Sequence, residues 1–209
     1  LARDKRLQSY TFRACLTKAK GTSQATPIEA PSDYNASRFQ LFARHIAALE
    51  KHRPQKPITL SDFFGCGSYG HEKCDTNDGS ALGLNPMGNE TYHWALVSPA
   101  ARQRLRAVFV NYTLGLFHFL GYDSRVPASV RLEMQSYGLC ADEWAGSNEQ
   151  NLPHLPYVRE GRRMDGKDFV FTQEDYRARI GDDKLPVGIL SQHFVCPSAV
   201  HTCNGSSKS

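Results

Sequence analysis

Hydrophobic and polar residues alternate over residues 7–17, the spacing of a strand with one buried face. The apolar side of this strand would consist of Tyr10, Phe12, Ala14 and Leu16. The opposite side is mixed and carries the charged Arg13. We therefore expect a half-buried strand near the start of the chain.

Farther along, apolar residues recur at helical spacing over residues 33–51, which predicts an amphipathic helix. Pro54 ends it, because proline has no amide hydrogen to continue a helix. Residues 57–64 predict a short strand, and the segment after it is rich in Gly, Asn, Asp and Ser, typical of a long functional or disordered loop. The apolar stripe of the helix consists of Phe39, Phe42, Ile46 and Leu49.

Two further helices are predicted from their caps and apolar stripes. Ser98 and Pro99 suit the N-cap and first turn of a long helix that Gly121 would end. A second helix begins at Pro127 and stops before Gly138, and the short link predicts that the two pack as a hairpin. The stripes consist of Leu105, Val108, Phe109, Tyr112, Leu116 and Phe119 in the first helix, and of Val130, Met134 and Tyr137 in the second.

Toward the end of the chain, residues 157–164 predict a strand, and Thr172 caps a short helix that runs to Ile180. Residues 187–196 predict one more strand. Strands and helices do not alternate regularly, as they would in a doubly wound parallel sheet. We therefore expect an α+β fold of mixed strands with a helical hairpin.

The formal net charge of +4 is spread along the chain, so nucleic-acid binding is not expected. No apolar stretch approaches the roughly 18 residues needed to span a bilayer, so no membrane partner is expected. The sequence carries no signature of an oligomeric state. The chain opens on Leu1 and its tail after Thr202 is polar, from which we expect an internal piece of a longer protein.

Six cysteines and four Asn-x-Ser/Thr sequons favour a secreted or extracytoplasmic glycoprotein, with a cytoplasmic location as the alternative. The sequon at Asn111 falls inside a predicted helix, where access for a glycan would be poor. The other sequons are at Asn35, Asn89 and Asn204.

The cysteines allow two interpretations. In an oxidising compartment, disulfides would close the small loops from Cys66 to Cys74 and from Cys196 to Cys203. Alternatively, these cysteines and nearby histidines could hold a metal, although neither spacing is that of a zinc finger or ribbon. The disulfides are the favoured interpretation. The histidines concerned are His71, His193 and His201.

Residues 65–70 have the sequence GCGSYG and match the dinucleotide-binding pattern G-x-G-x-x-G after a predicted strand. The pattern works when its third glycine opens a helix whose N-terminal amides hold a pyrophosphate. The residues that follow, HEKCDTNDG, have no helical apolar stripe. We therefore interpret the segment as a glycine-rich turn.

Three arginines lie in the predicted strand of residues 157–164, YVREGRRM. Arg159 and Arg163 share one face of it, while Arg162 lies on the other face with Glu160. Either the arginines are solvated, or one presents a fixed guanidinium to a carboxylate, a phosphate or a developing negative charge. The segment alone favours neither interpretation.

Five segments, taken in order, resemble a family of FAD-dependent oxidoreductases whose members often accompany bacterial polysaccharide-degradation enzymes. In that family, an N-terminal Rossmann-type segment and a C-terminal return hold the FAD. The resemblance implies that residues 1–186 form the substrate-side, or cap, region and that residues 187–209 begin the return, truncated or divergent. The segments are residues 8–17 (QSYTFRACLT), 33–39 (DYNASRF), 73–77 (KCDTN), 123–127 (DSRVP) and 157–164 (YVREGRRM).

The resemblance also implies roles for individual residues. Arg159 or Arg163 would be an electrostatic anchor for the substrate, and Arg162 would lie toward the flavin. A loop beside the flavin would supply polar positioning groups. The residues of this loop are Asp75, Thr76 and Asn77.

His193 or His201 would act as general base, since an imidazole of near-neutral pKa suits proton abstraction. The family tends to show a Ser-Tyr-x-x-Asp-x-His pattern after its last helix. If His201 is the matching histidine, Ala199 stands at the acidic position, which weakens an acid-base role for this segment.

The implied reaction is hydride transfer from a carbon of a small organic substrate to the flavin, with a carbohydrate-related compound as one candidate and with orientation and charge supplied by the protein. The fragment alone would be inactive. One alternative is a secreted, disulfide-stapled module that binds carbohydrate, where Trp94 and Trp144 could stack on sugar rings, although a lone Trp beside a loop more often serves packing. Another is a metal-dependent hydrolase.

Overall fold

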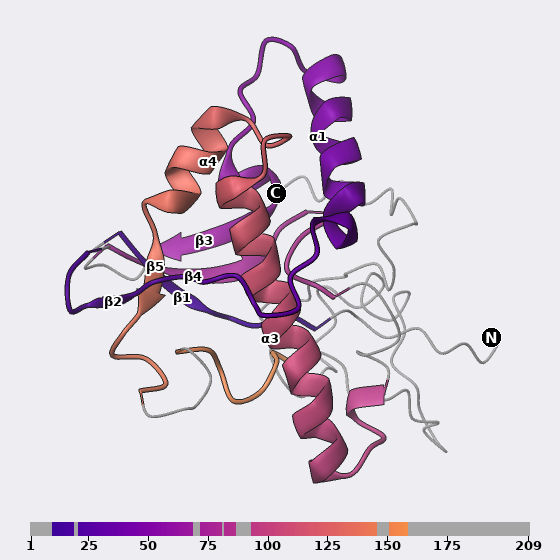
Figure 1. Cartoon of the computed structure of the whole chain (residues 1–209), viewed down its shortest axis with the longest axis vertical. Helices are drawn as coiled ribbons and strands as arrows, with labels where there is room; N and C mark the ends of the chain where they lie inside the picture. The colour runs from indigo at the N-terminus through magenta and orange to yellow at the C-terminus, as the bar shows by residue number, and fades with distance from the viewer. Residues whose placement is uncertain are drawn as a thin grey trace, which may run out of the picture.

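The computed structural model describes residues 10–18, 21–68, 72–80, 82–86, 93–145 and 151–158. Within these residues, an antiparallel sheet has the strand order β2-β5-β1-β4-β3, and the long helix α3 crosses one of its faces (Figure 1). The expected α+β class is confirmed. The strands are β1 (Cys15–Thr17), β2 (Ala25–Thr26), β3 (Phe64–Ser68), β4 (Lys73–Asp78) and β5 (Gly138–Cys140). The helices are α1 (Gln40–His52), α3 (Pro99–Tyr122) and α4 (Ala128–Gln135), with the 3-10 turns η1 (Ala36–Phe39) and η2 (Leu60–Asp62).

The central strand β1 pairs with β4 on one side and with β5 on the other. Strand β1 is shorter than the strand predicted over residues 7–17, since it covers only Cys15–Thr17. Thr11 pairs with Tyr157 through an isolated bridge and is not part of a continuous strand. The Tyr157 amide donates to the Thr11 carbonyl at 2.7 Å. The predicted apolar side is confirmed, since its members are all fully buried: Tyr10, Phe12, Ala14 and Leu16.

The strand predicted at residues 57–64 is wrong in position. Residues 60–62 form η2 instead, and β3 begins only at Phe64. A capping box causes this, because the Thr59 amide donates to Asp62 Oδ2 at 3.0 Å and so starts a helical turn. The chain therefore enters the sheet several residues later than the hydrophobic pattern indicates.

The loop predicted at Asp75, Thr76 and Asn77 is also wrong, because these residues lie in β4 and pair with β3 as a hairpin. The same hairpin includes the first part of the glycine-rich segment, residues 65–68. Their first glycines lie in β3, and the next element is a strand and not a helix. The glycine-rich turn expected here is wrong for residues 65–68, which lie in β3, while the expectation that no dinucleotide-binding helix follows agrees with the next described element being β4.

The predicted helices within the described residues are confirmed, and α3 and α4 pack as the expected hairpin. Ser98 caps α3 by accepting from the Ala101 amide at 3.3 Å, and Gln135 Nε2 donates to the Gly121 carbonyl at 2.6 Å. In the part of the chain that is described, no helix is both long and apolar enough to cross a bilayer. The helix predicted at 172–180 and the strand at 187–196 lie outside the described residues.

Aromatic rings hold the helices to the sheet. Phe64 of β3 packs on Phe117 of α3 with ring centres 5.6 Å apart, and Phe12 packs on Phe109 at 5.7 Å. Phe39 lies at the centre of the helical side of the core, where it is 2% exposed. The rings around it are those of Tyr34, Phe42, Tyr112 and Phe119.

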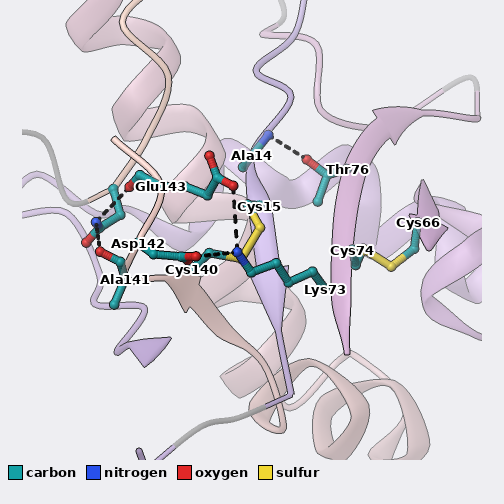
Figure 2. Close-up of a disulfide and its surroundings, with 11 residues drawn as sticks. Ala14, Cys15, Cys66, Lys73, Cys74, Thr76, Cys140, Ala141, Asp142 and Glu143 are labelled. Atoms are coloured by element: carbon teal, nitrogen blue, oxygen red, sulfur yellow. Dashed lines mark hydrogen bonds and ion pairs between the residues drawn. A yellow bond between two sulfur atoms is a disulfide. The ribbon is translucent and has the colours of Figure 1, made fainter. Parts of the chain in front are cut away.

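Two disulfides staple the sheet (Figure 2). The predicted pair Cys66–Cys74 is confirmed and links β3 to β4, so neither sulfur is free to bind a metal. The second pair, Cys15–Cys140, joins β1 to β5 across a separation of 125 residues. Cys196 and Cys203 lie outside the described residues.

Loss of the Cys15–Cys140 disulfide is expected to lower stability more than loss of the Cys66–Cys74 disulfide. A cross-link across 125 residues removes about 5 kcal/mol of unfolded-chain entropy, against about 2.5 kcal/mol for one across 8 residues. The two double Cys→Ser variants should therefore differ by roughly 2 kcal/mol in the free energy of unfolding, measured with urea. Equal losses in the two variants would contradict this expectation.

Candidate functional site

The strand junction is our name for Arg13, Asp75, Asn77, Tyr157 and the backbone of Thr11, at one edge of the β1–β4 pair. Arg13 donates to Asp75 Oδ1 from Nε at 3.1 Å and to Oδ2 from Nη2, which is a two-pronged charged contact. The Arg13 guanidinium also lies 5.4 Å from the centre of the Tyr157 ring. The Arg13 and Asp75 side chains are 31% and 19% exposed, so solvent still reaches the pair.

Thr76 differs from its two neighbours in β4, because it is fully buried. Its Oγ1 accepts from the Ala14 amide at 3.0 Å, and its own amide donates to the Ala14 carbonyl at 2.9 Å. Thr76 therefore locks β4 onto the residues leading into β1. The half-buried Asp75 and Asn77 alternate with Thr76 along the strand, so they point to the opposite face of the sheet.

Arg106 of α3 fixes the segment that approaches the strand junction from the other side. It is 6% exposed, and its Nε donates to the carbonyls of Pro153 and His154 at 3.0 Å each. Its Nη2 donates to the Leu152 carbonyl at 3.2 Å, and its guanidinium lies over the Phe12 ring at 5.4 Å. Burial lowers the pKa of Arg106 from its ordinary value.

Asn151 secures the start of the same segment. Its Oδ1 accepts from Thr26 Oγ1 at 2.7 Å, and its Nδ2 donates to the carbonyls of Ala141 and Glu143 at 3.1 and 2.8 Å. Lys73 at the start of β4 reaches to Asp142 and Glu143 in the same turn (Figure 2). The segment 151–158 is therefore tied at its start to the edge strand β2 and the turn after β5, and near its end to Thr11, which precedes the central strand β1.

The remaining site residues expected from sequence lie outside the described residues. They are Arg159, Arg162, Arg163, His193 and His201. The chain reaches Arg159 directly from Tyr157 and Val158, whose positions beside the strand junction are described.

The segments of the resemblance gather at two places in the fold. The first, third and fifth segments meet at the strand junction, through the β1–β4 pairing and the Thr11–Tyr157 bridge. The second and fourth meet at the end of α3. There Arg125 forks onto Asp123 through two hydrogen bonds of 2.8 Å and donates to Gln40 Oε1 at 2.6 Å.

Three groups near the end of α3 have shifted pKa values: Asp123, Tyr34 and His118. The hydrogen bond from Arg125 holds the pKa of Asp123 below its ordinary value of 3.8. Burial, with the nearby Asp123 carboxylate, raises the pKa of Tyr34. Burial lowers the pKa of His118, whose ring lies 4.7 Å from that of Tyr34 and 4.8 Å from that of Tyr122. His118 is therefore neutral at pH 7.

A cavity of about 360 Å³ lies between the segment before η1 and the middle of α3. Its volume is near the lower end of ligand pockets, which run from roughly 300 to 1,000 Å³. Its lining mixes apolar and polar side chains and includes the ion pair of Asp33 and Arg38 at 3.2 Å. The lining residues on α3 are Ala107, Val108, Asn111, Tyr112 and Gly115.

The expected FAD needs a glycine turn that leads into an open helix N-terminus. No described helix offers one. The turn η1 runs directly into α1, α3 opens with Ser98 and Pro99, and α4 follows Pro127 closely after the end of α3. The described residues therefore do not form a cradle for the dinucleotide.

Sequence reasoning missed two site residues, Arg13 and Arg106. A weak signal existed for Arg106, which lies on the buried side of α3 three residues before Phe109, where a charged residue indicates an internal partner. Arg13 gave no signal, because charged residues are ordinary on the open side of a strand.

Arg106 is expected to position the segment 151–158. Arg106→Lys keeps the charge but loses the planar fork that serves several carbonyls, so the free energy of unfolding should fall by about 2–3 kcal/mol. Limited proteolysis should also show faster cleavage within residues 152–158. Arg104→Lys, an exposed change on the same helix, is the matched control and should alter stability by less than about 0.5 kcal/mol. Equal effects in the two variants would remove the positioning role.

Asp123 is expected to make stability depend on pH. Because its folded pKa is lowered, its stabilising contribution is complete above about pH 5 and is lost as the pH falls through the folded pKa, below 3.8. Between about pH 5 and pH 2 the unmodified protein should lose about 1–2 kcal/mol more stability than Asp123→Asn in urea titrations. Asp33→Asn, at a carboxylate that is 47% exposed, is the control and should retain the full acid dependence.

Comparison with known proteins identifies the family to which the chain belongs. A sequence model of the family described as FAD dependent oxidoreductase matches residues 1–192, which include all five segments and every described residue. No curated protein and no solved structure matches the chain significantly. The chain therefore belongs to the FAD-dependent oxidoreductase family.

Proposed function

We propose that this chain forms the substrate-side wall of a flavoenzyme that moves a hydride from a carbon of a small organic substrate to flavin. Family membership over residues 1–192 is the observation that carries the proposal. When bound, the flavin supplies the redox chemistry, while the protein supplies orientation and charge. Since the described residues lack a dinucleotide cradle, the FAD would be held mainly by other polypeptide.

The strand junction is the part of this chain that we assign to the reaction. Its Arg13–Asp75 pair is held by two hydrogen bonds, so Asp75 offers a fixed carboxylate that solvent still reaches. Asp75 and Asn77 would position polar groups of the substrate. The arginines that follow Tyr157 would approach the same edge of the sheet, and a guanidinium there suits a carboxylate, a phosphate or a developing negative charge.

Within this proposal, Arg159 or Arg163 is the electrostatic anchor and Arg162 lies toward the flavin. His193 or His201 is the general base that takes a proton from the substrate. Together with Asp75 and Asn77, these side chains would bind and orient the substrate while excluding water. A substrate related to carbohydrate fits the resemblance and the polar character of this set.

We also propose an oxidising, extracytoplasmic location. The support is that all four cysteines among the described residues are joined in disulfides, which persist where thiols are not kept reduced. A structural metal at Cys66 and Cys74 would need free thiolates, which the disulfide removes. Within the described residues, no group of three or more His, Cys, Asp or Glu side chains could hold a metal ion, so a hydrolytic metal site finds no support there.

The proposal predicts that Arg159→Ala in the complete protein lowers turnover more than tenfold while the flavin content stays unchanged. The physical reason is that a substrate or developing charge would lose its fixed guanidinium. Turnover is measured as anaerobic bleaching of the flavin after rapid mixing with oxidisable sugars and sugar acids. Arg104→Ala, exposed on α3, is the matched control and should leave turnover unchanged.

Turnover and flavin content of the Arg159→Ala variant test different parts of the proposal. Unchanged turnover would remove Arg159 from the site, and loss of flavin would make it a cofactor ligand instead. A complete protein that is folded and colourless, yet binds oligosaccharides, would replace the oxidoreductase with the carbohydrate-binding alternative.

A further inference from the structure

Two of the sequons lie among the described residues, and their asparagines differ in exposure to solvent. Asn35 stands in the exposed segment just before η1, whereas Asn111 lies in the middle of α3. An N-linked glycan needs an asparagine amide that the folded chain leaves in solvent, with space for a bulky sugar. The two asparagines can therefore be compared on exposure, hydrogen bonding and surroundings.

The Asn35 side chain is already held in a geometry that suits modification. Its Oδ1 accepts from the Ser37 amide at 2.9 Å, an Asx turn that caps η1 and brings the sequon serine next to the asparagine. Glycosylation replaces one hydrogen of Nδ2 and leaves Oδ1 as an acceptor, so the cap survives the modification. Asn35 and Ser37 are both exposed, so the sugar can extend into solvent.

The surroundings of Asn111 are different. Its backbone lies in α3, and its side chain forms part of the wall of the cavity of about 360 Å³. The sequon hydroxyl belongs to Thr113, which is fully buried in the core. A glycan at Asn111 would have to leave through that cavity, between α3 and the segment of Asp33 to Asn35.

We infer that Asn35 carries an N-linked glycan and that Asn111 does not. In the transfer, Nδ2 of Asn35 forms a bond to C1 of the first sugar of a lipid-diphosphate-linked oligosaccharide. The bond from C1 to the diphosphate oxygen breaks, the lipid diphosphate leaves, and one Nδ2 proton is released. The inference does not depend on the flavin chemistry, but it rests on the oxidising compartment proposed above.

The glycan would also stand beside the cavity, because the exposed Asn35 is among its lining residues together with Asp33, Tyr34 and Arg38. It would shield the cavity from large molecules while leaving the strand junction, on other elements, uncovered. The cavity lining and the strand junction share no residue.

The test is peptide mapping by mass spectrometry of the complete protein secreted from eukaryotic cells. Treatment with a glycan-releasing amidase in heavy-oxygen water converts a glycosylated asparagine to a labelled aspartate, and we expect the label at Asn35 and none at Asn111. Ser37→Ala removes the sequon but keeps the amide that donates to Asn35, so it should lose the mass of one glycan while η1 stays capped. Asn111→Gln is the matched control and should keep the full mass.

Two results would overturn the inference and distinguish its parts. An unlabelled Asn35, or a labelled Asn111, in secreted and disulfide-bonded protein would refute the glycan assignment alone. Free thiols at Cys15 and Cys140 in the native protein would refute the oxidising compartment and the glycan with it. Neither result would bear on the proposed hydride transfer from substrate to flavin or on the positioning role of the strand junction.

Discussion

The pairing of β1 with both β4 and β5 holds distant parts of the chain in one sheet. β1 comes from the start of the described chain, β4 from its middle and β5 from residues 138–140. Thr76 and Ala14 exchange two hydrogen bonds just beyond the regular pairing, and the isolated bridge at Thr11 extends the contact to Tyr157. Because each of these contacts is non-local, the strand junction exists only when the whole sheet has formed.

A buried cation organises the approach to that junction. Arg106 donates hydrogen bonds to the carbonyls of three successive residues, and its guanidinium lies over the face of Phe12. Because these contacts are to backbone carbonyls, they fix the course of the main chain over residues 152–154. Helix α3 thus holds this segment next to the residues that precede β1.

The helices and β1 could be predicted from sequence because their apolar residues follow a clear period, as at Phe42 and Ile46 of α1. β4 could not, since its buried positions are Cys74 and Thr76 and its sequence KCDTND is otherwise polar. The strand at 57–64 failed because a local capping box at Thr59 and Asp62 competes with extended structure. The candidate site was found only in part. Asp75 and Asn77 stood out, whereas Arg13 and Arg106 become visible only through partners far away in sequence.

The long-range disulfide has a consequence for how the chain matures as it is made. Cys15 emerges from the ribosome well before Cys140 exists, and Cys66 and Cys74 are synthesised between them. During that interval Cys66 and Cys74 can oxidise to their disulfide, while Cys15 remains a free thiol whose thiolate form is able to attack it. Formation of the native disulfides therefore requires thiol–disulfide exchange to stay reversible until β5, which carries Cys140, has been synthesised. A disulfide isomerase would accelerate this exchange.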